Sequence, residues 1–147
     1  MDEPIMNISS DKKLALKQIL AWYTKQQKQV ANTDNQQYLT LGGYAGTGKT
    51  TLIAILRKIL FKQNPKIRVA FAAFTGKAAR VLKTYLKDNG VLYKNDSIGT
   101  IHSLIYSVIE NERHEIIGWK RKEEIKADLI IIDEASMVDQ KIWFDLL

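Results

Sequence analysis

Lys49 and Thr50 end the stretch GYAGTGKT, which begins at Gly43 and has the spacing of a phosphate-binding loop. Its glycines let the backbone turn so that successive N–H groups point at phosphate oxygens. The Lys49 ammonium can bridge the β- and γ-phosphates of a nucleotide, and the Thr50 hydroxyl can ligate Mg²⁺. The residues that we expect to contact the nucleotide are Gly43, Ala45, Gly46, Thr47, Gly48, Lys49, Thr50 and Thr51.

The segments on either side of this loop have the composition of a strand and a helix. Residues 38–41 are mostly apolar and β-favouring, and apolar side chains recur at helical spacing from Leu52 to Leu60. Asn64-Pro65 is a stop signal for that helix. A glycine-rich turn with a chance lysine is the alternative interpretation. The order strand, loop, helix favours the phosphate loop, because that motif requires this context.

Asp133 and Glu134 directly follow an apolar run, Leu129 to Ile132, that is typical of a buried parallel strand. A carboxylate at the end of such a strand can hold Mg²⁺ through water, and the next carboxylate can orient or deprotonate an attacking water. We therefore assign Asp133 to the metal, and Glu134 to catalysis together with Lys49. The other interpretation of Glu134 is a helix-start carboxylate favoured by the helix dipole.

Two further helix starts carry polar side chains that suit a nucleic-acid backbone. The Thr75 hydroxyl, free N–H groups and the Lys77 ammonium can grip a phosphate, and Thr100 begins a similar turn with His102. The alternative is that Thr75 caps its helix, that Lys77 is solvated, and that His102 has a structural role. His102 and His114 do not form a metal pair, because no carboxylate or thiolate completes a site.

Positive charge is concentrated in the middle of the chain. Residues 57–94 carry ten Lys and Arg side chains against Asp88 alone, a local charge of +9, whereas the 147-residue chain has a net charge of +6. Such a segment suits a polyanion such as nucleic acid, and it equally suits a solvated helix face beside a phosphate site. The tryptophans are expected mainly in the core, although one exposed ring could stack on a base: Trp22, Trp119 and Trp143.

Two absences in the sequence limit the class of protein. The sequence lacks cysteine, which excludes disulfides and thiolate metal sites and fits the reducing cytoplasm. Residues 1–4 are acidic and lead into no long apolar run, and no segment approaches the length of a membrane span. We therefore expect a cytoplasmic protein with no signal peptide and no membrane partner.

Helices and strands alternate along the chain, which predicts an α/β fold with a parallel sheet and helices on both faces. Ligands of such sheets bind at the carboxyl ends of the strands, where Thr75 and Asp133 fall. We expect residues 1–37 to form an N-terminal helix and a lead-in loop, and residues 38–147 to form one nucleotide-binding domain. The expected elements are helices over 11–29, 49–63, 74–89 and 101–110 and from 139, strands over 38–41, 67–73 and 129–132, loops over 31–37 and 91–99, and a hairpin over 116–119 around Gly118.

Four segments stand in a fixed order along the chain: GYAGTGKT (43–50), AFTGKAA (73–79), TIHSL (100–104) and IDEASMVD (132–139). Together they resemble motifs I, Ia, Ib and II of superfamily 1B DNA helicases, the RecD-like and Dda-like group. The resemblance implies a RecA-like P-loop NTPase domain that hydrolyses ATP with Mg²⁺ and moves 5′ to 3′ on single-stranded DNA. It also implies that Thr75, Lys77, Thr100 and His102 contact the DNA.

The chain departs from the pattern of this group in two places. Lys12 stands where the group usually has a glutamine that reads adenine, so the sequence does not predict which base the site selects. The chain ends at Leu147, soon after motif II, and motif III and a second RecA-like domain with its arginine finger are not in it. We therefore expect a truncated motor domain that binds nucleotide weakly and hydrolyses it poorly by itself.

Two other classes of protein share some of these features. An AAA+-type remodeller or loading factor shares the phosphate loop and Asp133-Glu134, but it does not require Thr75-Gly-Lys77 or Thr100-Ile-His102. A non-catalytic module could bind nucleic acid through the basic middle of the chain, although Glu134 at the expected position of a water-activating carboxylate argues against it. The sequence makes no prediction of the oligomeric state.

Overall fold

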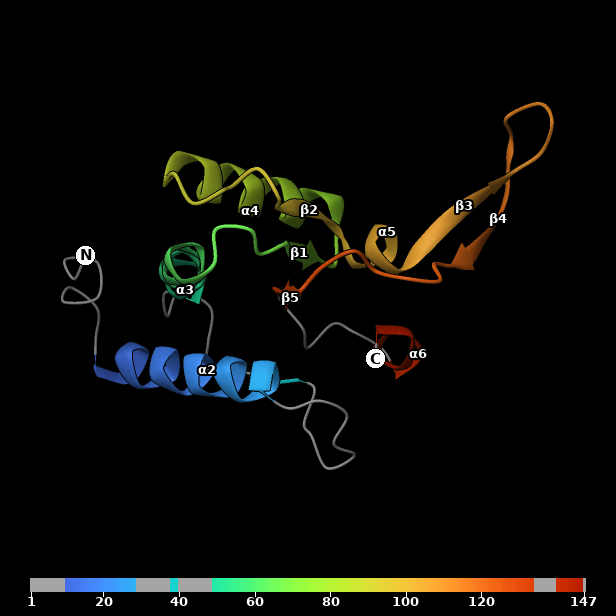
Figure 1. Cartoon of the computed structure of the whole chain (residues 1–147). Coiled ribbons are helices and arrows are strands. Elements are labelled where there is room, and N and C mark those ends of the chain that lie inside the picture. Colours follow the sequence, from blue (N-terminus) through green and yellow to red (C-terminus); the bar gives the residue numbers. More distant parts are fainter. Residues whose placement is uncertain (1–9, 29–37, 40–48, 134–139, 147) are drawn as a thin grey trace. The chain divides into compact units, whose positions relative to one another are not determined.

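The computed structural model describes residues 10–28, 38–39, 49–133 and 140–146 of the chain (Figure 1). The chain forms two compact units, Met1–Ile59 and Leu60–Leu147, and each is described by itself. The loop expected over 31–37 lies outside the described residues, as do residues 40–41 of the strand expected over 38–41 and residues 43–48 of the phosphate loop.

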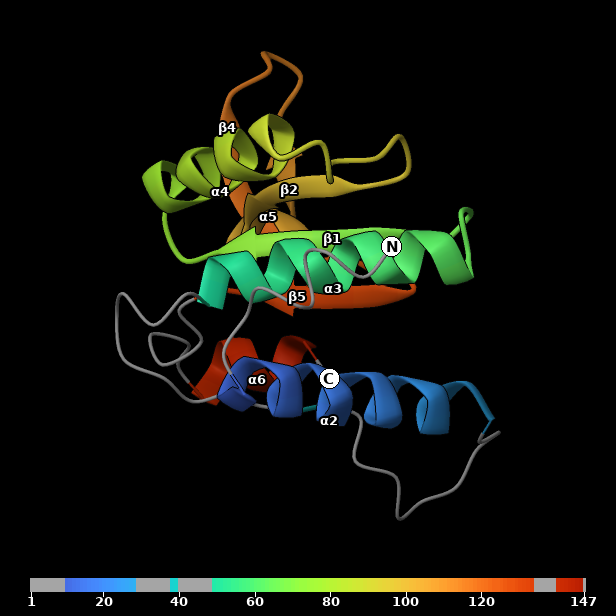
Figure 2. The same ribbon diagram turned by 90° about the vertical axis from the view of Figure 1, so that its left-hand side faces the viewer.

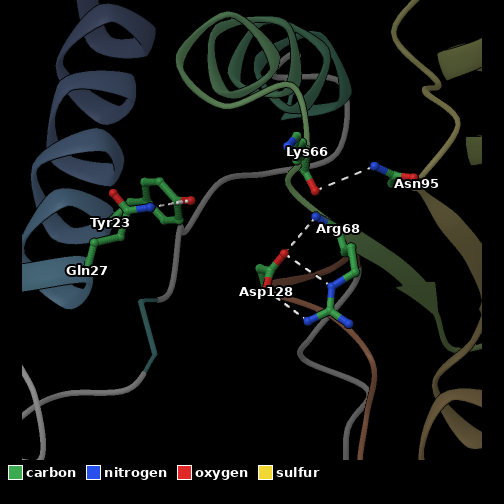
Figure 3. A network of polar contacts seen from close by, with 6 residues as sticks. All are labelled: Tyr23, Gln27, Lys66, Arg68, Asn95 and Asp128. Atoms are coloured by element: carbon green, nitrogen blue, oxygen red, sulfur yellow. Dashed lines mark hydrogen bonds and ion pairs between the residues drawn. The ribbon is translucent and has the colours of Figure 1, made fainter.

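The first unit contains helix α2, Ser10–Lys28, at the position predicted. Leu16 and Tyr23 are buried two helical turns apart, and the Gln27 amide donates a hydrogen bond of 2.8 Å to the Tyr23 hydroxyl (Figure 3). Leu14 lies on a different face of the helix, and 57% of its surface is exposed. Two residues advance a helix by about 200°, which turns Leu14 away from the stripe that contains Leu16.

Helix α3, Lys49–Gln63, begins in the first unit and ends in the second. It stops one residue before Asn64-Pro65, as predicted, and the Asn64 N–H still donates a hydrogen bond of 2.9 Å to the Leu60 carbonyl. The expected apolar face is confirmed, because the side chains that recur at helical spacing are buried: Leu52, Ile55, Leu56 and Leu60, together with Ala54.

The second unit is built on a parallel sheet of three strands in the order β2-β1-β5 (Figure 2). These are β1, Val69–Ala73, β2, Ser97–Thr100, and β5, Leu129–Ile132. Every residue of the central strand β1 is buried, as expected of a parallel strand with neighbours on both sides. The predicted α/β class with a parallel sheet is confirmed.

Helix α4, Gly76–Asp88, follows β1 and has defined caps at both ends. At its end the Gly90 N–H donates to the Lys87 carbonyl, and the Val91 N–H donates to the Leu86 carbonyl, each at 3.0 Å. These two bonds form a Schellman motif, and Gly90 adopts the left-handed φ of 67° that the motif requires. The predicted helix end near Asn89-Gly90 is therefore confirmed.

Two predictions for the next segment are wrong. The loop expected over 91–99 ends in a strand, because Ser97–Thr100 pairs with β1. The helix expected over 101–110 stops early, since α5 covers Ile101–Ile105 and the chain then continues as strand β3, Tyr106–Glu110. Apolar spacing of three and four residues suggested a longer helix, but Val108 is exposed rather than turned toward the core.

Strands β3 and β4, Ile116–Arg121, form an antiparallel hairpin (Figure 1). The hairpin expected around Gly118 therefore exists, but its turn lies at 111–115 and Gly118 pairs with Ile109 inside the ladder. The Asn111 side chain organises the turn, because its oxygen accepts hydrogen bonds from the N–H groups of Arg113 (2.9 Å) and Glu115 (3.0 Å).

An ion pair ties the segments that lead into β1 and β5. The Asp128 carboxylate accepts hydrogen bonds from the Arg68 backbone N–H (2.8 Å) and from the guanidinium (3.1 and 3.3 Å; Figure 3). The guanidinium bond, followed by the backbone bond, holds the pKa of Asp128 below its ordinary value, and the same pair raises the pKa of Arg68. The pair thus aligns the amino-terminal edge of the sheet.

A small apolar cluster joins the sheet to two helices of the second unit. Ala72, Ile101 and Ile105 are buried together, and Ile132, Ile142 and Leu146 are among the apolar side chains packed against them. Ile142 and Leu146 belong to α6, Gln140–Leu146, which confirms the helix predicted from residue 139. This cluster fixes α5 on the sheet and so determines where the following hairpin begins.

Candidate functional site

Lys49 and Thr50 form the start of α3 and are half-buried, and Thr51 next to them is exposed. The first turn of this helix contains no acidic side chain. A helix N-terminus of this kind favours an anion, because its N–H groups and its dipole both present positive charge. The other predicted phosphate-loop residues lie outside the described residues: Gly43, Ala45, Gly46, Thr47 and Gly48.

Asp133 lies one residue beyond β5, at the carboxyl end that the sequence predicted. It is half-buried, and its backbone N–H donates a hydrogen bond of 3.0 Å to the Ala72 carbonyl of the central strand. Glu134 lies outside the described residues. Lys49 belongs to the first unit and Asp133 to the second, so their joint role remains a prediction.

The strand register brings three predicted site residues to one edge of the sheet. Ala73 pairs with Thr100, and Ala72 pairs with Ile132 next to Asp133. Because all three strands are parallel, their carboxyl ends meet there, and Thr75 follows two residues after β1. Thr75, Thr100 and Asp133 therefore share the carboxyl edge of the sheet.

Thr75 and Thr100 are both helix N-caps. The Thr75 hydroxyl accepts a hydrogen bond of 3.1 Å from the Ala78 N–H, and the Thr100 hydroxyl accepts one of 3.1 Å from the Ser103 N–H. The capping alternative is therefore confirmed for Thr75, and Thr100 caps its helix in the same way. Capping does not exclude a ligand, because a hydroxyl that accepts one bond can still donate its own hydrogen.

Two basic side chains, Lys77 and Arg80, lie near the first turn of α4, which contains no acidic side chain. Lys77 is exposed in this turn. A Cβ at Gly76 would lie 3.8 Å from Arg80 Nη1, so the Arg80 guanidinium also lies beside the start of the helix. The helix dipole disfavours positive charge at this end, and a bound phosphate would relieve the repulsion.

His102 is exposed and packs against two aromatic rings of the hairpin. Its ring centroid lies 4.6 Å from that of Tyr106 and 4.8 Å from that of Trp119, which it meets edge to face. Trp119, expected mainly in the core, is 50% exposed. Sequence reasoning missed this neighbour of His102, although Tyr106 and Val108 stand two residues apart, as positions on one face of a strand do.

The basic residues of the middle segment are exposed, with one exception. Arg57 is fully buried in α3, so it does not belong to a basic surface. The exposed ones are Lys58, Lys62, Lys66, Arg68, Lys77, Arg80, Lys83, Lys87 and Lys94. Arg68 is engaged by Asp128 at the opposite edge of the sheet, whereas Lys77 and Arg80 lie at the carboxyl edge.

The described residues contain neither a metal-binding cluster nor a helix that could cross a membrane. No group of three His, Asp or Glu side chains in this part of the chain could hold a metal ion by itself. Among residues 10–28, 38–39, 49–133 and 140–146, no helix combines the length and the hydropathy that a bilayer crossing requires.

The sequence of this chain is similar to those of known proteins. A family model described as an AAA domain matches residues 26–147. The chain is 34% identical over 116 residues to the RecBCD enzyme subunit RecD of Buchnera aphidicola, which covers 71% of this chain and 19% of that protein. It is 31% identical over 135 residues to the RecBCD enzyme subunit RecD of Mycolicibacterium smegmatis, with 84% and 24% covered.

An uncharacterized protein of Acanthamoeba polyphaga mimivirus is 29% identical over 127 residues, which is 78% of this chain and 26% of that protein. The chain thus spans about a fifth to a quarter of the length of these relatives. The family model covers all four motif segments, since it extends from residue 26 to residue 147.

Proposed function

We propose, from the premise that this chain belongs to the AAA-domain family and to the RecD-like helicases of superfamily 1, that it is the ATP-hydrolysing motor part of a DNA helicase. The main observation that supports this proposal is that Thr75, Thr100 and Asp133 share the carboxyl edge of the sheet. There Asp133, a predicted Mg²⁺ residue, lies at the end of a strand next to the one that leads to Thr75. A change at the nucleotide can reach the nucleic acid through this one edge.

The start of α3 fits a nucleoside triphosphate, because its first turn presents N–H groups and no carboxylate. In this proposal Lys49 and Thr50 hold the phosphates and Mg²⁺, and Asp133 holds Mg²⁺ through water. Glu134 orients or deprotonates the attacking water. The ATP–Mg²⁺ complex supplies the phosphoryl group that is transferred to water.

Single-stranded DNA is the proposed polymer at the carboxyl edge. Thr75 and Thr100 donate their hydroxyl hydrogens to phosphate oxygens, and the exposed Lys77 adds a positive charge. His102 lies two residues after Thr100 and contacts the same DNA strand in this proposal. The direction of movement, 5′ to 3′, is proposed from the resemblance to the superfamily 1B group.

The helicase function belongs to the whole protein that contains these motifs. We propose that a second RecA-like domain closes over the nucleotide and supplies an arginine to the transferred phosphate. This chain by itself is then expected to bind nucleotide weakly and to hydrolyse it poorly. The cytoplasmic location expected from the sequence stays a prediction.

The experiment is ATP hydrolysis by the complete natural protein that contains this chain, with and without single-stranded DNA. We expect strong stimulation by DNA, its loss in Lys49→Ala, and a fall of roughly 10²- to 10⁴-fold in Glu134→Gln with DNA binding retained. Hydrolysis that ignores DNA would favour an AAA+-type NTPase instead. DNA binding without any hydrolysis, unchanged in Glu134→Gln, would favour a non-catalytic module.

A further inference from the structure

The charges of helix α4 are almost all positive. The helix contains four basic side chains and one acidic side chain, Asp88, at its last position. Three of the basic residues, Arg80, Lys83 and Lys87, recur at intervals of three and four residues, so they lie on one side of the helix about one turn apart. All three are exposed, and we call them the basic stripe of α4.

The basic stripe lies beside the buried side of the helix and not on it. Each of its residues comes directly after a buried residue in the sequence, and one residue turns a helix by about 100°. The stripe is therefore a flank of α4 that the sheet leaves uncovered. The buried residues of the helix are Ala79, Leu82 and Leu86.

The charge pattern of the stripe differs from that of a helix face that is merely solvated. Such faces usually pair opposite charges three or four residues apart, whereas Lys83 and Lys87 repeat the same charge at that spacing. Among the described residues, no carboxylate forms an ion pair with any residue of the stripe. The helix dipole favours Lys87 in the last turn, but it disfavours the Arg80 guanidinium beside the start of the helix.

The stripe begins at the carboxyl edge of the sheet and leads away from it. The Arg80 guanidinium lies beside the first residue of α4, which follows Thr75. Strand β2 begins opposite Ala70, near the start of β1, so the chain between the two strands returns toward the amino-terminal edge. Lys83 and Lys87 lie on this returning helix. A polyanion along the stripe would therefore be continuous with one bound at Thr75.

The stripe offers positive charge without a surface for stacking. Sites for single strands usually combine cations with aromatic rings on which the bases stack. The aromatic residue of α4, Tyr85, is half-buried and stands two residues from both Lys83 and Lys87, which turns it about 160° away from them. Charge alone suits a duplex, because paired bases are covered and the phosphates remain accessible.

We propose that the basic stripe of α4, formed by Arg80, Lys83 and Lys87, binds the phosphate backbone of double-stranded DNA. This inference rests on the proposed function, because a helicase that holds a single strand at the carboxyl edge of the sheet meets the duplex next to it. The contacts are made to phosphates, so the binding does not depend on the base sequence.

The test measures the affinity of the complete natural protein that contains this chain for a labelled blunt-ended DNA duplex and for an oligothymidylate, over a series of salt concentrations. The stripe variant combines Arg80→Gln, Lys83→Gln and Lys87→Gln. Glutamine is a good helix former, so α4 should stay folded, which circular dichroism and thermal unfolding check.

The matched control removes three positive charges from exposed positions outside the stripe. It combines Lys62→Gln, Lys66→Gln and Lys94→Gln, so both variants have the same net charge. A third variant, Lys83→Arg with Lys87→Arg, keeps the charge of the stripe and should bind the duplex as the wild type does.

The stripe variant should lose duplex affinity and salt dependence together. The slope of log affinity against log salt should become shallower by about 2 to 3, because each phosphate contact contributes about 0.9. At about 0.1 M salt the duplex should bind at least tenfold more weakly. The control variant should keep the wild-type slope, and the two variants should bind oligothymidylate equally well.

Three results overturn the inference while the proposed function stands. Equal loss of duplex affinity in the stripe variant and the control would show that net charge is responsible and not the stripe. Equal loss of duplex and oligothymidylate affinity in the stripe variant would show that the stripe extends the single-strand site. Wild-type binding to oligothymidylate without binding to the duplex would exclude a duplex site. If the wild type binds neither DNA, the proposed function fails and the inference fails with it.

Discussion

The central strand β1 and the β3–β4 hairpin lie in the same unit, but they differ in how far their apolar side chains are buried. In β1 no residue exposes more than 1% of its surface, whereas five large apolar side chains of the hairpin expose 37% to 64%. Apolar burial stabilises the sheet, and a backbone ladder with a few polar and aromatic contacts holds the hairpin. The stability of the unit therefore lies in the sheet, and the hairpin offers surface for binding.

Among the substitutions considered, Phe71→Ala should cause the largest loss of unfolding free energy. Phe71 is 1% exposed in the middle of β1, and truncating a buried phenylalanine costs about 3–5 kcal/mol of unfolding free energy. Urea unfolding of the variant measures this loss, and Phe71→Leu, which keeps most of the volume, should lose much less. A loss below about 1 kcal/mol in Phe71→Ala would contradict a sheet held by burial, since losses that small are typical of exposed positions.

Gly90→Ala should cost less, because it changes one backbone position rather than the core. Gly90 has a φ of 67°, and an L-residue in this left-handed region costs about 1–2 kcal/mol. Apart from its two chain neighbours, no heavy atom of the described residues lies within 4 Å of a Cβ built at this position, so the cost would come from the backbone alone. Thermal unfolding checks this, with Gly90→Asn as the milder control, since asparagine tolerates that conformation.

Acidification should weaken the Arg68–Asp128 pair and so lower the stability of the fold. The folded pKa of Asp128 is lowered, so the unfolded chain binds more protons in acid and the contribution of the pair is complete above the ordinary value of 3.8. It is lost as the pH falls through the lowered folded value. The effect should be small, because the side chains are 48% and 45% exposed and water screens their charges.

Asp128→Asn tests this pH dependence. The variant should unfold with a shallower loss of stability below pH 3.8 than the wild type. An identical acid profile for the two proteins would show that the pair contributes nothing to the stability of the sheet.

Ile117→Ala should have the smallest effect. Ile117 is 64% exposed in β4, and substitutions at such positions change stability by about 0.5 kcal/mol or less. Denaturant unfolding beside Phe71→Ala gives the direct comparison between hairpin and sheet. A loss in Ile117→Ala as large as the loss in Phe71→Ala would remove the distinction between the two regions.

The elements that the sequence predicted correctly are those with a strong local signal. The apolar run of β5, the proline after α3 and the Asn89-Gly90 end of α4 each determine the backbone through neighbouring residues. Strand β2 was missed because Ser97 and Gly99 are poor strand formers, and this segment becomes a strand through its pairing with β1.

The exposed hairpin was predicted least well. Ile101, Leu104, Ile105 and Val108 satisfy helical spacing, yet the chain turns into a strand at Tyr106 because residues 106–110 pair with 116–121. That pairing is a contact between distant residues, and periodicity does not report it. Thr75 and Thr100 were predicted correctly as helix starts, because that signal is local. The contact between His102 and Trp119 was not predicted, because it joins residues that are distant in the sequence.

The most direct test of the central claim is the concentration of single-stranded DNA that half-stimulates ATP hydrolysis by the complete natural protein. Lys77→Ala is compared with Lys94→Ala, which removes another exposed charge of the same basic segment. The account predicts that Lys77→Ala needs severalfold more DNA while its DNA-independent hydrolysis is unchanged, and that Lys94→Ala behaves as the wild type. Equal requirements for DNA in the two variants would contradict a DNA site at the carboxyl edge of the sheet.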